Sequence, residues 1–108
     1  MNMDPEIQAE LDQAEAARSA GNEGKARVCA RRAAGIAARL YYHRHGVRVE
    51  SSSAYYLLST LAEKLDLEDG IRKAARNLTR QVDPDFRLPP GVDLIAEARE
   101  VCNKLSSL

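Results

Sequence analysis

The segment from Asn22 to Arg48 restricts the fold of this 108-residue chain more than any other part of the sequence. Small or apolar side chains recur in it every three or four residues, which is the period of one face of an α-helix. They are Ala26, Cys29, Ala30, Ala33, Ile36, Ala37, Leu40 and Tyr41. The segment therefore predicts one long helix, from about Glu23 to His45, that lies in the middle of the core. Gly35 costs about 1 kcal/mol relative to Ala inside a helix, so we expect another backbone to approach closely there.

Helices are also expected on both sides of this segment, because capping residues precede further apolar stripes. One helix should begin at Asp4 and end at Gly21, and the tight turn to Asn22 favours an antiparallel hairpin. The later helices are expected at about residues 54–64, from residue 66 to residue 82, and at residues 94–105, with the Pro-rich stretch 83–92 as a loop. The chain thus predicts a single all-α domain over residues 1–108, an antiparallel up-and-down bundle of four or five helices.

Composition excludes several classes of protein. The chain has no run of about 18 apolar residues that could span a membrane, and its acidic N-terminus does not resemble a secretory signal. Cys29 and Cys102 fall on expected helical faces, so we interpret them as buried thiols of a cytoplasmic protein rather than as a disulfide. Neither belongs to a Cys/His cluster, so no metal site is predicted, and no cofactor is expected.

Charge is balanced overall but unevenly distributed. Residues 1–23 carry six acidic side chains and one basic one, whereas residues 24–49 carry seven basic side chains and no acidic one. Lys25, Arg32 and Arg39 lie seven residues apart and should form one exposed ridge, with Arg27 and Arg31 beside it. This ridge either binds an anionic partner or pairs with acids of the first helix inside the fold.

Candidate contact residues follow from this charge and from the aromatic residues near it. Phosphates would bind the cationic side chains, and a tyrosine ring could stack on a base. The candidate binding residues are Lys25, Arg32, Arg39, Tyr42, His43 and Arg44. Tyr55 and Tyr56 point about 100° apart on a helix and cannot both enter the core. Tyr55, Tyr56 and Leu58 are therefore candidates for a dimer interface, unless that helix is simply central in the bundle.

Two stretches resemble the HEPN family of small helical-bundle proteins. AARSAGNEGKARVCARRAAGIAARLYY is similar to that family's helical hairpin, with a glycine at the turn and an Ala-rich second helix. AARNLTRQVDPDFRLPPGVDLIAEAREVCNKL is similar to the family's C-terminal helix, Pro-containing loop and last helix. The resemblance implies a four- or five-helix bundle, frequent homodimerisation, and association with nucleotide, RNA or a nucleotidyltransferase partner protein.

Some HEPN proteins are metal-independent, toxin-like ribonucleases, and in those four to six residues lie between an Arg and a following His at a dimer cleft. The one such spacing here is Arg39 to His45, in the second helix, whereas the family motif belongs in the C-terminal half. The loop also lacks the aromatic residue expected ahead of Pro84. The leading hypothesis is therefore a non-catalytic binding or regulatory module. The alternatives are a ribonuclease that uses Arg39 and His45, and a helical scaffold for protein interactions.

Overall fold

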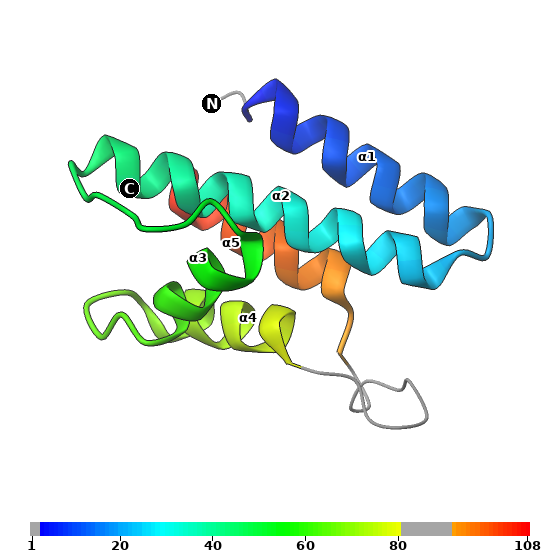
Figure 1. The fold of residues 1–108 in the computed structure, drawn as a ribbon. Helices are drawn as coiled ribbons and strands as arrows, with labels where there is room; N and C mark the ends of the chain where they lie inside the picture. The colour runs from blue at the N-terminus through cyan, green and yellow to red at the C-terminus, as the bar shows by residue number, and fades with distance from the viewer. Residues whose placement is uncertain (1–2, 81–91) are drawn as a thin grey trace.

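The chain forms a bundle of α-helices. The computed structural model describes residues 3–80 and 92–108, and it contains no strand in these ranges. The helices are α1 (Pro5–Ser19), α2 (Glu23–Arg44), α3 (Ala54–Ala62), α4 (Asp69–Thr79) and α5 (Leu94–Ser106). Figure 1 shows α2 in the middle, with α1 along one side, α3 and α4 on the other, and α5 behind it. The prediction of an all-α bundle with α2 at its centre is confirmed.

Helix ends follow the local sequence closely. The Asp4 carboxylate accepts a hydrogen bond from the backbone N–H of Glu6, and the Asn22 side chain accepts one from the N–H of Lys25. Asp93 caps α5 in the same way, accepting from Ile95 and Ala96. Each side chain satisfies an N–H that the first helical turn leaves without a partner.

The core is built from small residues of α2 and larger residues of the helices around it. Among the residues predicted to form the apolar face of α2, Ile36 and Leu40 are partly exposed. The smaller residues of that face and Tyr41 are buried. Ala34 and Ala38 are also fully buried, although they lie outside that predicted stripe. Leucines and other large apolar side chains from α1, α3, α4 and α5 pack against these alanines: Leu11, Leu57, Leu58, Leu61, Ile71, Leu78, Leu94 and Leu105. Small side chains on α2 therefore let four other helices come close to it.

Gly35 is the point of closest packing on α2. A Cβ atom placed on Gly35 would lie 2.6 Å from the Cβ and 2.9 Å from the Cα of Ala54, the first residue of α3. Real Cβ atoms do not come this close to their neighbours, and one of the two neighbouring atoms is backbone. The expected close approach is confirmed, and it positions the start of α3 against the middle of α2.

The connection between α3 and α4 differs from the prediction. α3 ends at Ala62 rather than at Lys64, and α4 begins at Asp69, so Asp66 lies in the turn and caps nothing. Leu65 is 81% exposed, while Leu67 is buried in its place. The spacing of apolar residues in the sequence could not predict this difference, because only one of the two leucines in the turn packs into the core. Val82 and residues 83–91, which the sequence predicts to be a loop, lie outside the described residues.

The ends of three helices are joined by one side chain. The Arg18 guanidinium, at the end of α1, donates to both carboxylate oxygens of Glu23 and to Asp93, each at 2.9 Å. These contacts lower the pKa of the Glu23 carboxyl. Arg18 thus connects α1 to the first turn of α2 and to the cap of α5.

Candidate functional site

The basic ridge of α2, formed by Lys25, Arg32 and Arg39, lies on the surface as predicted. Residues seven apart on a helix lie about 10.5 Å apart along its axis, on nearly the same side. Lys25 and Arg32 are exposed and form no ion pair with any described residue, whereas Arg39 lies 3.6 Å from the carboxylate of Glu6 on α1. Two of the three ridge charges are therefore available to a ligand. The third charge, on Arg39, is partly neutralised by Glu6, as expected if the ridge pairs with acids of the first helix.

A cavity of about 330 Å³ runs beside the ridge, between α1, α2 and the residues that lead into α3. Its lining combines two acids and two cations with a small apolar floor: Glu6, Ala9, Glu10, Arg32, Gly35, Ile36, Arg39, Ser52 and Ala54. One carboxylate oxygen of Glu10 is buried without a hydrogen-bond partner. Nothing in the helical periodicity indicates this cavity, because its acids come from a helix that is distant in sequence from Ser52 and Ala54.

Arg31, on the neighbouring row of α2, has a structural role. Its Nε donates to the carbonyl of Leu78, 2.7 Å away, close to the end of α4. Burial and the nearby positive charge of Arg27 lower the pKa of Arg31. Burial is the larger of the two causes, which fits a side chain that is packed into the fold rather than offered to a ligand.

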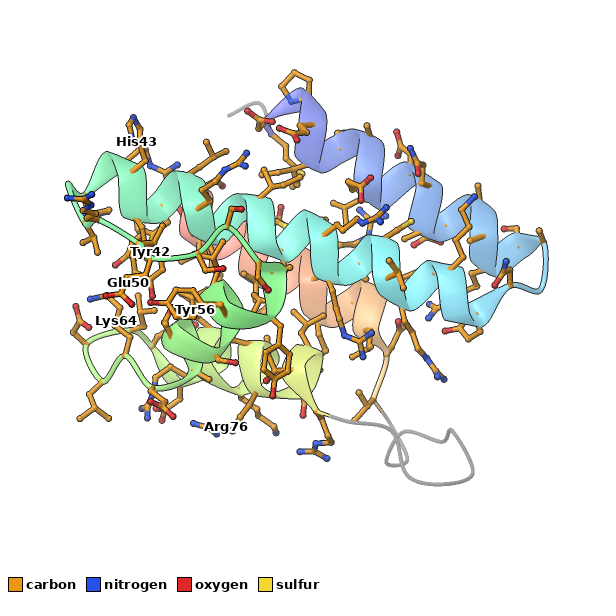
Figure 2. All side chains as sticks on the ribbon, in the orientation of Figure 1. Tyr42, His43, Glu50, Tyr56, Lys64 and Arg76 are labelled. Atoms are coloured by element: carbon orange, nitrogen blue, oxygen red, sulfur yellow. The ribbon has the colours of Figure 1, made fainter. Side chains whose placement is uncertain are left out.

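Tyr42 does not belong to the exposed binding surface, and this part of the prediction is wrong. Its side chain is only 5% exposed, and its hydroxyl lies 2.7 Å from that of Thr60 on α3. Thr60 itself donates to the carbonyl of Leu57, so the hydroxyl hydrogen between the two residues belongs to Tyr42. Figure 2 shows Tyr42 pointing from α2 toward α3, and His43 pointing away on the opposite side of α2. A buried ring cannot stack on a base.

His43 and Arg44 lie at a different cavity from the ridge. It has a volume of about 350 Å³ and is lined by Met3, Asp4, Ile7, Ala37, Leu40, His43, Arg44, Cys102 and Ser106. One N–H of Arg44 donates to the carbonyl of Leu105 at 2.7 Å, near the end of α5, which is a favourable place for a cation. Burial raises the pKa of the Cys102 thiol to about 12, so this cysteine is not a nucleophile at neutral pH.

The structure does not bring Arg39 and His45 together. A separation of six residues places side chains about 120° apart around a helix. Arg39 faces Glu6 on α1, whereas the His45 ring packs on Tyr41 with the ring centres 4.4 Å apart. The cavity beside the ridge, here called the ridge cavity, is lined by Arg39 and not by His45. This geometry provides no site at which one substrate could contact both side chains of the same protomer.

The candidate interface residues on α3 lie in three different environments. Tyr55 is 56% exposed, Tyr56 is partly buried, and Leu58 is fully buried in the core. The expectation that the two tyrosines cannot both be core residues is confirmed. The assignment of Leu58 to an interface is wrong, because its side chain is already covered within the protomer.

Comparison with family models, with curated proteins and with solved structures found no match to this chain. Within residues 3–80 and 92–108, no group of three or more His, Cys, Asp or Glu side chains could hold a metal ion. Among the helices described above, none combines the length and the apolar character that crossing a membrane requires.

Proposed function

We propose that this protein is a small non-catalytic binding module whose ligand carries phosphates, as a nucleotide or an RNA strand does. The observation that carries the proposal is the pair Lys25 and Arg32, two exposed cations on one side of α2 without an acidic partner among the described residues. Most other arginines of the same segment have an internal role: Arg27 pairs with Glu23, while Arg31 and Arg44 donate to carbonyls. Cations without internal partners are the side chains that phosphate contacts use.

The geometry supports binding more than ribonuclease activity. Cleavage of RNA without a metal needs a proton-transferring group and a charge-stabilising group at the same phosphate. Arg39 and His45 point in different directions from α2, and the His45 ring is packed on Tyr41. A binding module needs only charge at the surface, which Lys25 and Arg32 supply.

The proposal includes an antiparallel, HEPN-like arrangement of the bundle and a homodimer in the cytoplasm. Exposed Tyr55, at the start of α3, supports the dimer, because a large aromatic side chain at the surface is typical of contact sites. Its test is light scattering of the wild type and of Tyr55→Ser, which should dissociate the dimer. A wild-type protein that is monomeric with and without RNA would contradict this part of the proposal. Association with a nucleotidyltransferase-type partner would be a further property of the same dimer.

The test of ligand binding is fluorescence anisotropy with a labelled single-stranded oligoribonucleotide at low salt. The variant Lys25→Gln/Arg32→Gln should bind at least about tenfold more weakly, because two phosphate contacts are lost. The matched control is Lys64→Gln/Arg99→Gln, which removes the same charge from side chains that pair with Asp66 and Glu15. Equal affinity in the two double variants would refute a role for the ridge.

A further inference from the structure

The one buried polar side chain among residues 3–80 and 92–108 is Asn77, on α4, which is 6% exposed. It lies on the inward stripe of α4, between the core residues Ala74 and Leu78. Its amide forms no hydrogen bond with any residue that the structure describes. Its polar atoms therefore reach water at the surface, where a ligand could bond them instead.

Asn77 opens into a cavity of about 370 Å³ along α4, here called the α4 cavity. The other lining residues are Asp69, Gly70, Lys73, Arg76 and Arg80. Lys73, Arg76 and Arg80 follow one another at intervals of three and four residues, so they lie along one side of the helix with Asn77. Figure 2 shows Arg76 at the edge of the bundle, on the side of α4 away from α2.

The cations of the α4 cavity are not neutralised by the fold. Lys73 and Arg80 form no ion pair or hydrogen bond with described side chains, and the one contact of Arg76 is a long bond of 3.5 Å to the carbonyl of Ala62. The single acid in the lining, Asp69, is at the far end of the helix and pairs with Arg72 at 3.3 Å. The cavity thus presents three cations and an amide to a ligand.

We propose that the α4 cavity binds a phosphate group, which the three cations hold while the Asn77 amide donates to one of its oxygens. A phosphate has several acceptor oxygens and a negative charge, so it satisfies the amide N–H groups and the cations together. An apolar ligand would leave both the amide and the cations unsatisfied. The site lies on a different helix from the α2 ridge, and it can exist whether or not the ridge binds RNA.

The test follows the side-chain amide signal of Asn77 by nitrogen-15 NMR of the full chain, assigned from its absence in Asn77→Ala. The probes are inorganic phosphate, pyrophosphate, a ribonucleoside 5′-monophosphate and a short oligoribonucleotide. A saturable shift of the amide signal is expected, and in Arg80→Gln the affinity should fall at least about tenfold. Saturation by inorganic phosphate indicates a site for free phosphate compounds, whereas saturation by the oligoribonucleotide alone assigns the site to RNA.

Arg48→Gln is the matched control, since Arg48 is exposed in the connector after α2 and carries the same charge. This variant should bind the phosphate as the wild type does. Lys25→Gln/Arg32→Gln should also keep the Asn77 shift, which separates this site from the α2 ridge. No saturable shift with any of the four probes, or equal affinity in Arg80→Gln and Arg48→Gln, would overturn the proposal. If Arg80→Gln does not fold, Lys73→Gln takes its place.

Discussion

Gly35 and Ala54 pack so closely that a methyl group on Gly35 would lie 2.6 Å from the Cβ of Ala54. This contact joins the middle of α2 to the first residue of α3. It also lies at the floor of the ridge cavity, so the same packing that holds the bundle together shapes the surface beside Arg32.

Gly35→Ala should therefore destabilise the fold by about 1–2 kcal/mol, since the strain of overpacking exceeds the gain in helix propensity. Urea denaturation measures this change. Gly24→Ala is the control on the same helix, because the nearest atom to its added methyl group is the Asn22 side-chain oxygen, at 3.8 Å. That variant should be neutral or more stable. A Gly35→Ala protein as stable as the wild type would mean that α3 does not approach α2 in this way.

The Tyr42 hydroxyl provides a test in alkaline solution. Burial raises the pKa of Tyr42. The unfolded chain, with an ordinary tyrosine pKa of about 10, therefore loses its phenolic proton at a lower pH than the folded chain does. The contribution of Tyr42 to stability is complete below pH 10 and is lost as the pH rises through the raised pKa.

Tyr42→Phe should lower the free energy of unfolding at neutral pH by about 1 kcal/mol, through loss of the bond to Thr60. It should also make stability less dependent on pH above about 10. If Tyr42→Phe and the wild type show the same dependence of stability on pH above about 10, Tyr42 is not buried in solution.

The sequence predicts most of the fold because the relevant signals are local. The caps at Asp4, Asn22 and Asp93 depend on residues within one turn, and the structure confirms them. A glycine inside a helical pattern is itself a local signal of close packing, which the structure confirms at Gly35, although the sequence does not show that the partner is Ala54. The burial of Tyr42 could not be predicted in this way. It depends on Thr60, which lies 18 residues away on a helix whose position only the tertiary structure defines.

The candidate site was harder to predict than the fold. Helical spacing correctly places Lys25 and Arg32 at the surface, yet it cannot show that Arg39 meets Glu6 or that Arg44 bonds the end of α5. These partners come from segments far away in the chain. The position of Asn77 on the inward side of α4, beside the cations of the α4 cavity, was not predicted, because Asn resembles any polar residue in a helical pattern.

Asn77→Ala should raise the free energy of unfolding by about 0.5 kcal/mol, the difference in helix propensity, because no hydrogen bond of the amide within the protein is lost. Thermal and urea denaturation in buffer free of phosphate measure this effect. Asn103→Ala, at an exposed position of α5, should change stability by about the same amount. A marked loss of stability in Asn77→Ala would show that the amide is already bonded in the free protein.

Glu6→Gln should strengthen RNA binding by about two- to threefold, because it releases Arg39 from an exposed ion pair. The measurement is the anisotropy titration with the same oligoribonucleotide. Glu15→Gln is the control, since Glu15 pairs with Arg99 on α5 rather than with the ridge. Equal gains in the two variants would mean that only net charge matters and that the position of Arg39 does not.

The most direct test is the salt dependence of RNA affinity in the wild type and in Lys25→Gln/Arg32→Gln. Each phosphate contact contributes a slope of about −0.7 to a plot of log affinity against log salt concentration for a single strand. The slope of the double variant should therefore be smaller in magnitude by about 1.4. Identical slopes, or no binding by the wild-type protein even at the lowest salt concentration, would contradict the assignment of the α2 ridge as a phosphate-binding surface.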